Sequence, residues 1–155
     1  MSLATIRQSM CTAVKAISPT LHSDEKFREW PNTSDFVEFC EKNPASARRL
    51  FFIRGTGDVR IESDNSSMRW EITEVECVVA YPRDFHAGEL MLNDLDDLIE
   101  SDLLQFDATI GTAGYSTLED AVSGVVTTIG QSREDGEACV FGVLRLRVEF
   151  WRATQ

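Results

Sequence analysis

Histidine, glycine-rich loops and paired cysteines are scarce in this sequence of 155 residues. The two histidines, His22 and His86, have no Cys, Asp or Glu that would join them at the spacing of metal ligands. Gly55 and Gly57 are followed by Arg60 where a dinucleotide-binding loop has its third glycine, and no Walker loop occurs. These absences predict a protein that is not an enzyme and that binds neither a metal nor a cofactor.

Long apolar runs are also missing. No stretch approaches the roughly 20 residues of a membrane-spanning helix, so we expect no membrane partner, and residues 1–17 do not have the pattern of a signal peptide. The cysteines lie far apart and never as C-x-x-C, which favours reduced, buried thiols in a cytoplasmic setting over disulfides or zinc ligands. They are Cys11, Cys40, Cys77 and Cys139.

Lysine is the rarest charged residue, and its three copies all lie in the first third of the chain. Residues 1–54 contain eight Lys and Arg against six Asp and Glu, whereas residues 55–155 contain seven Arg against twenty acids. Tight wrapping of nucleic acid needs a cation at each phosphate contact, so the net charge of −11 argues against it. An acidic wall that DNA slides past is compatible with this charge.

The apolar residues follow helical and strand periods in turn. A hydrophobic share of 43% and nine phenylalanines are sufficient for the core of one domain. The periods predict two amphipathic helices and four main strands, in the order helix, strands, helix, hairpin. The helices are expected at 3–17 and 89–104, and the strands at 49–54, 69–81, 121–129 and 138–151.

This order predicts one α+β domain over residues 1–155, in which an N-terminal helix and one central acidic helix pack on an antiparallel sheet. Residues 19–47 are expected to be a loop with a short helix that Ser34 or Asp35 caps and that runs through Cys40. Residues 131–136 are expected to be a polar loop between the last two strands. The strand at 69–81 is longer than a small domain needs, which indicates a projecting hairpin.

The helix predicted at 89–104 combines an apolar stripe with an opposite face of acids and no basic residue. Like charges on one helix repel and destabilise it slightly. Either this face is an ordinary solvated surface, or a function has placed the charges there. The stripe consists of Met91, Leu95, Leu98, Ile99 and Leu103, and the acids are Glu89, Asp94, Asp96, Asp97, Glu100 and Asp102.

Three of these segments together resemble a known family. The strand EITEVECVVAYP ends in an aromatic residue and proline, and the leucine-rich acidic helix LMLNDLDDLIESDLL follows it directly. The third segment is the hairpin VSGVVTTIG…VFGVLRLRVEFW, and an amphipathic helix precedes all three. Over about two thirds of the chain, this arrangement resembles the tail terminator proteins of long-tailed bacteriophages, also called minor tail U-like or tail completion proteins.

The resemblance implies a structural protein of the virion that forms a six-membered ring with other copies of itself. Such a ring caps the tail tube protein, ends tube polymerisation and joins the tail to the head completion or connector protein. The protein would be assembled in the host cytoplasm and lie at the head-proximal end of the tail. DNA would pass through the ring without specific binding, along a pore for which the candidate lining residues are Glu89, Asp94, Asp97, Glu100 and Asp102.

A ring needs two different faces of one domain for its subunit contacts. We expect the strands at 69–81 and 138–151 to supply sheet edges for these contacts. The basic first third could also pair with the acidic remainder of a neighbouring copy. The candidate interface residues are Arg145, Arg147, Trp70 and Trp151.

Two other interpretations stay open. One is a head–tail connector (neck) protein or a tail-tube subunit, which belongs to the same kind of assembly. The other, from a different class, is a cytoplasmic α+β ligand-binding domain or small enzyme. A ring of roughly 100 kDa would support the terminator, whereas a monomer or dimer with a closed pocket would support the second class.

Overall fold

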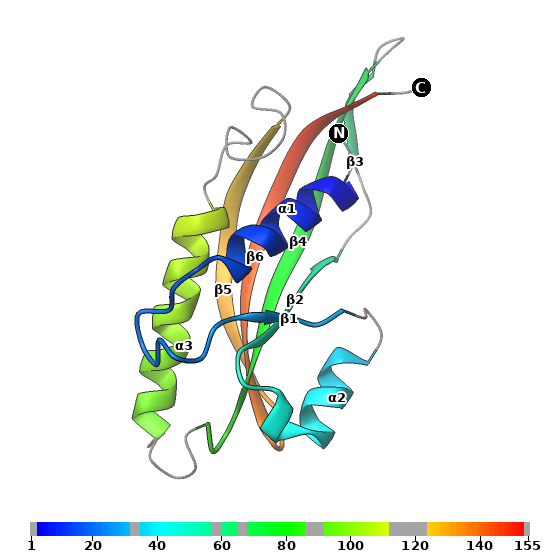
Figure 1. The fold of residues 1–155 in the computed structure, drawn as a ribbon. Helices are drawn as coiled ribbons and strands as arrows, with labels where there is room; N and C mark the ends of the chain where they lie inside the picture. The colour runs from blue at the N-terminus through cyan, green and yellow to red at the C-terminus, as the bar shows by residue number, and fades with distance from the viewer. Residues whose placement is uncertain are drawn as a thin grey trace.

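The fold is α+β, as the sequence predicts, and a computed structural model describes it for residues 3–31, 35–56, 60–64, 68–85, 92–111 and 124–153 (Figure 1). The helices are α1 (Leu3–Lys15), α2 (Phe36–Lys42) and α3 (Leu92–Phe106), with a 3₁₀ turn η1 (Pro44–Ser46) and a π-helical turn η2 (Asp107–Gly111). The strands are β1 (Arg28–Glu29), β2 (Leu50–Gly55), β3 (Arg60–Asp64), β4 (Met68–Pro82), β5 (Gly124–Asp135) and β6 (Cys139–Ala153).

Within the described residues these strands form one sheet in the order β1-β2-β4-β6-β5, and β3 pairs with the first part of β4. β1 is parallel to β2, and the other neighbours are antiparallel. β4 and β6 have 15 residues each and pair along their whole length. As predicted, the long strand forms a projecting hairpin, because β3 and the adjoining end of β4 extend past α1 at the top of Figure 1.

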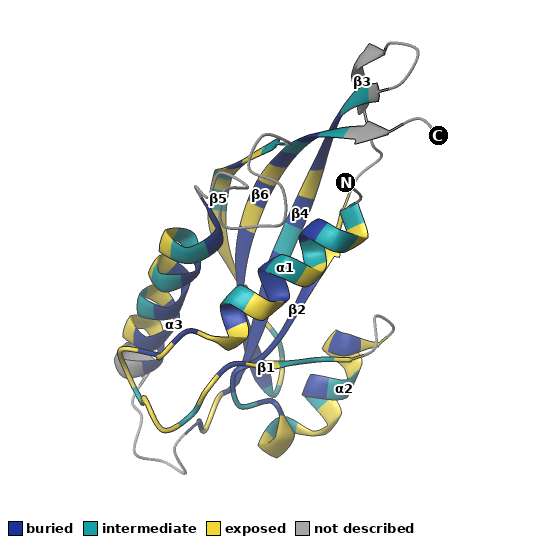
Figure 2. Cartoon of the chain, turned by 45° about the horizontal axis from the view of Figure 1, so that its top comes forward, coloured by how far each residue is buried: buried dark blue, intermediate teal, exposed yellow. Residues whose placement is uncertain are grey.

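α1 and α3 cover one face of the sheet (Figures 1 and 2). The apolar stripes predicted from the sequence face inward, which confirms them for the described residues, whereas Met91 lies outside these. Gly142 of β6 allows α3 to approach closely, because a Cβ atom there would lie 3.2 Å from the Ile99 side chain. The buried residues of the two stripes are Ile6, Met10, Val14 and Ile17 from the first, and Leu95, Leu98, Ile99 and Leu103 from the second.

α2 covers the opposite face of the sheet at one end only. Phe36 and Cys40 of α2 pack there with Phe52 of β2 and Phe141 of β6. The strands in this region are therefore covered on both faces, whereas α2 does not extend over the same face toward the other end of the sheet. All four cysteines are buried and free of disulfides, as predicted.

Two predictions about the strands are wrong. Residues 131–135 are not a loop but the second half of β5, which pairs with residues 140–144 of β6. Their side chains are polar because they are exposed on an outer strand, where the backbone alone makes the pairing. The strands expected to supply sheet edges, β4 and β6, are instead the central pair. The edges of the described sheet are β1, β2 and β3 on one side and β5 on the other.

Candidate functional site

The acidic face of α3 is only partly where the sequence places it. Asp96, Asp97 and Glu100 are exposed, and Arg133 of β5 forms an ion pair with Asp96. The sequence pattern missed this partner because it comes from another element. Glu89 and the side chain of Asp94 lie outside the described residues. Their place in a pore therefore stays a prediction.

Asp102 is not a pore-lining residue, because its side chain is completely buried. It lies three residues after Ile99 and four after Leu98, so it belongs to the buried stripe of α3 and not to the acidic face. This spacing in the sequence indicates that position 102 is buried. The residue was nevertheless assigned to the exposed face because it is an aspartate.

Arg49 and Tyr81 hold the Asp102 carboxylate inside the protein. The Arg49 guanidinium donates from Nε to Oδ2 at 3.1 Å and from Nη2 to Oδ1 at 3.3 Å. The Tyr81 hydroxyl donates to Oδ2 at 2.8 Å. Arg49 is also fully buried. Its backbone adopts the left-handed conformation, with a φ of 51°. This buried cluster of three residues joins β4, α3 and the start of β2.

The remaining guanidinium hydrogens of Arg49 bind the chain between α1 and β1. Nη1 donates to the carbonyl oxygens of His22 and Glu25, both at 2.6 Å, and Nη2 donates to that of Leu21. Five donated bonds match the five N–H groups of an arginine. The guanidinium carbon also lies 5.3 Å from the ring centre of Phe27. Full pairing of this kind indicates a structural clamp and not a reactive site.

The buried cluster shifts the pKa values of its members. Burial raises the pKa of Asp102 to about 6, and the neighbouring Arg49 charge and the hydrogen bonds from Tyr81 and Arg49 limit this rise. Burial also raises the pKa of Tyr81 well above its usual value, and the negative charge of Asp102 adds to that shift.

The pKa of Asp102 makes the stability of the protein dependent on pH. Because the folded pKa is raised, folding binds a proton between the unfolded pKa near 4 and the folded pKa near 6. The contribution of Asp102 to the free energy of unfolding is complete below pH 4 and is lost as the pH rises through 6. We therefore expect urea denaturation to give a free energy of unfolding that falls between pH 5 and pH 7, and falls less steeply in Asp102→Asn.

Asp97→Asn is the matched control for this pH dependence, since it removes an exposed carboxylate from the same helix. It should keep the slope of the wild-type protein. Equal slopes in all three proteins would show that Asp102 does not titrate in this range.

The four predicted interface residues lie on β4 and β6 and share the sheet face that α2 leaves open. The rings of Trp70 and Trp151 meet edge to face at 5.1 Å between their centres, and both are half-buried. Arg145 lies 3.4 Å from Glu74 of β4, and Arg147 lies 3.4 Å from a carboxylate on its own strand. Their part in a subunit contact stays a prediction.

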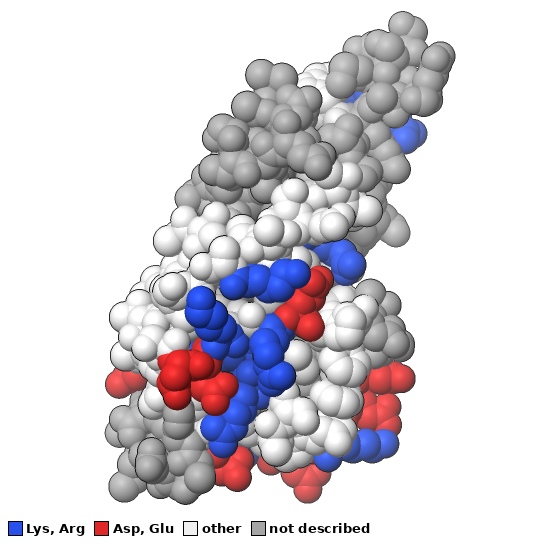
Figure 3. Space-filling view, viewed as in Figure 1, with Lys and Arg blue, Asp and Glu red and all other residues white. Residues whose placement is uncertain are grey.

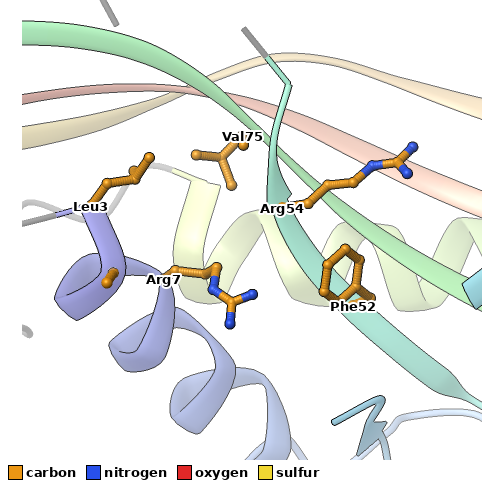
Figure 4. A pocket seen from close by; sticks show the side chains of 7 residues that line it. Leu3, Arg7, Phe52, Arg54 and Val75 are labelled. Atoms are coloured by element: carbon orange, nitrogen blue, oxygen red, sulfur yellow. The ribbon is translucent and has the colours of Figure 1, made fainter. Parts of the chain in front are cut away.

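A groove lies at the outer edge of β2, where β1 has ended. β1 pairs with β2 only at Leu50 and Phe51, so in the described part of the chain the rest of β2 has a partner strand on one side alone. The groove has a volume of about 470 Å³. Residues of α1, β2 and β4 line it, among them Leu3, Arg7, Phe52, Arg54 and Val75. In Figure 4, Leu3, Arg7 and Val75 lie around the space beside β2, whereas the side chain of Arg54 extends away from them.

Arg7 forms the middle of a longer hollow along α1. Its Nη1 donates to the carbonyl oxygen of Ile53 at 3.0 Å, and its guanidinium carbon lies 5.8 Å from the ring centre of Phe52. A second hollow of about 330 Å³ continues from Arg7 to Lys15 and Glu29, which form an ion pair at 3.2 Å. Figure 3 shows that Lys and Arg side chains gather on this face, over α1, β1 and the chain between them.

No protein family matches the chain, and no curated protein matches it. Among the described residues, no helix has the length and apolar character needed to cross a membrane. The same part of the chain holds no group of three or more His, Cys, Asp or Glu side chains placed to bind a metal ion.

Proposed function

We propose that the protein is a structural subunit that assembles through two different surfaces into a closed ring. Within that class, the function that the arrangement supports best is a tail terminator of a long-tailed bacteriophage. Its ring would cap the tail tube, end tube polymerisation and join the tail to the head connector. The observation that carries this proposal is the sheet, which in the described residues ends in unlike edges, with β1, β2 and β3 on one side and β5 on the other.

Unlike edges favour a ring because contacts between two different surfaces of one chain are head-to-tail, and they close when the rotation between neighbours allows it. An isolated β-edge also exposes backbone groups that pair readily with another chain. The projecting β3–β4 hairpin and the Trp70–Trp151 pair provide further surface for the tube or the connector.

The exposed acids of α3 support a pore wall that DNA does not adhere to. Asp97 and Glu100 are exposed and have no ion-pair partner among the described residues. At physiological salt their field extends over about 8 Å, and it repels phosphate. In this proposal Asp97 and Glu100 face the pore, together with Glu89 and Asp94 from the sequence prediction.

The first test is the mass of the purified protein. We expect native mass spectrometry to give a species of roughly 100 kDa, close to six copies of 17.4 kDa, and negative-stain images to show a ring with a central hole. A monomer or a closed dimer at all concentrations would contradict the proposal and would favour a ligand-binding domain that uses the groove at β2. A ring that stacks into tubes by itself would favour a tail-tube subunit.

The second test concerns the pore. The double variant Asp97→Lys, Glu100→Lys should still form the ring, because both side chains are exposed, and it should bind duplex DNA with an affinity that falls steeply as salt rises. Fluorescence anisotropy of labelled DNA at several salt concentrations measures this. The control Asp24→Lys, Asp84→Lys changes the charge equally at exposed positions elsewhere. Equal DNA binding by the two variants would show that α3 does not line the pore.

A further inference from the structure

The two edges of the sheet carry residues of opposite charge at the two ends of the same rows of paired residues. The strand register places Arg28 of β1 and Glu134 of β5 at opposite ends of one row of paired residues, which runs through Leu50, Ala80 and Phe141. The side chains of one row point to the same face of a sheet. Each edge therefore presents a charge that complements the other edge.

The next row repeats this complementarity with the signs exchanged. Glu29 of β1 and Arg133 of β5 end the row that runs through Phe51, Val79 and Gly142. β5 runs opposite to β1, so a β5 strand placed beside β1 continues an antiparallel ladder in which 28 meets 134 and 29 meets 133. Among the described residues, Arg28 and Glu134 have no ion-pair partner within their own chain.

Farther along the same edges, the groove on one edge lies opposite an exposed apolar side chain on the other. The row that ends at Gly55, beside the groove, ends on the other side at Thr128. A β-bulge follows Thr128, and its extra residue, Ile129, leaves the regular pairing. The Ile129 side chain is 44% exposed. The apolar lining of the groove, Leu3 and Val75 among it, is therefore level with an apolar residue on the opposite edge.

We propose that the β5 edge of one copy docks on the β1–β2 edge of the next copy, with Ile129 in the groove, Glu134 on Arg28 and Arg133 on Glu29. The proposal rests on the ring-forming function and names the surfaces that build the ring. The occupant of the groove is a second copy, because the charges and the shape that fit it lie on the opposite edge of the same chain. The contact also covers cations of the β1 edge, such as Arg28 and Lys15.

Two variants each alter one side of this contact, the β5 side or the groove side, without changing the net charge. Ile129→Gln removes the apolar side chain of β5. Gly55→Gln fills the groove from the end of β2, where an added Cβ would be 3.6 Å from Leu3 and 4.0 Å from the nearest backbone oxygen, which is ordinary contact. Each variant alone should be monomeric in native mass spectrometry, with the circular dichroism spectrum of a folded protein. Val37→Gln on α2, 43% exposed, is the control and should keep the ring.

A mixture of the two variants gives the decisive result. Ile129→Gln retains an intact groove, and Gly55→Gln retains an intact Ile129. One contact can therefore form between the two variants, whereas their remaining two surfaces are both altered and cannot form a second. We expect a heterodimer of about 35 kDa, twice 17.4 kDa, and nothing larger. No heterodimer, or a full ring from either variant alone, would overturn this assignment and leave the proposed function in place.

The charged rows provide an independent test. Arg28→Glu and Glu134→Arg should each raise the concentration for half-assembly by about tenfold or more, and the double exchange should restore it. A double variant that is no better than the single ones would overturn the pairing. A monomeric wild-type protein would overturn both proposals, whereas open chains of wild type together with a heterodimer from the mixture would overturn only the closed ring.

Discussion

Leu146→Asp should abolish folding. Leu146 is completely buried in the middle of β6, between Val75 of β4 and Thr128 of β5. Its side chain belongs to the core beneath α1 and α3. The substitution removes an apolar side chain and places a carboxylate among the buried hydrophobic residues of this core, at a cost of several kcal/mol. This is comparable with the whole stability of an ordinary domain, about 5–15 kcal/mol.

The measurement is a thermal melt followed by circular dichroism. We expect no cooperative transition in Leu146→Asp. Arg147→Gln is the control, since it changes the adjacent residue of the strand, which is exposed on the opposite face. It should lower the free energy of unfolding by less than about 1 kcal/mol. A cooperative melt of Leu146→Asp at the wild-type midpoint would mean that the faces of β6 are reversed.

The elements of the core could be predicted because their signals are local. The alternation of Leu144, Leu146 and Val148 with arginines defines the buried face of β6 without any knowledge of its neighbours. The spacing of Ile6, Met10 and Val14 does the same for α1. In both segments, the period of the apolar residues and the geometry of the element agree, and no tertiary contact is needed to predict which side is buried.

The second half of β5 and the order of the strands could not be predicted from local patterns. Residues 131–135 are polar throughout, and they form a strand only because β6 offers a partner along its outer side. A long apolar strand such as β4 can lie at the edge or in the centre of a sheet. Only its pairing with β2 on one side and β6 on the other shows that it is central. The sheet edges that we propose as the subunit contact therefore emerged only from the register.

The buried cluster was missed for a related reason. Arg49 and Asp102 are 53 residues apart in the sequence. Each occurs near another charged residue that is at least partly exposed, Arg48 in one case and Glu100 in the other. Composition therefore assigns both to the surface. The helical position of Asp102 within the apolar stripe predicts burial, but a buried carboxylate is expected only with a partner, and the partner is not visible until the chain is folded.

Arg49→Met should strongly destabilise the surroundings of α3. It leaves the buried Asp102 carboxylate without its cation, and the carbonyl oxygens of Leu21, His22 and Glu25 without donors. Breaking a buried ion pair from one side typically costs about 3–5 kcal/mol. Methionine is unbranched at Cβ, so it should add no strain of its own at the left-handed φ of 51° beyond that of arginine.

A double-mutant cycle distinguishes the buried ion pair from a general loss of packing. Arg49→Met combined with Asp102→Leu removes both charges, so the double variant should be more stable than the sum of the single effects predicts. Arg48→Met is the control. Arg48 is the neighbouring arginine, and its ion pair with Glu25, 3.6 Å long and partly exposed, should contribute at most about 1 kcal/mol. Additive single effects in urea denaturation would contradict the coupling of Arg49 to Asp102.

The clamp also connects stability to assembly. Arg49 holds the chain at residues 21–25, and β1 begins three residues later at Arg28. In the proposed ring, Arg28 and Glu29 of β1 meet the neighbouring copy. Arg49→Met should therefore weaken assembly even at a temperature where most of the protein is still folded, as measured by native mass spectrometry beside a far-ultraviolet spectrum. If the folded variant assembles like the wild type, either β1 keeps its position without Arg49 or the ring contact depends on β2 and β5 alone.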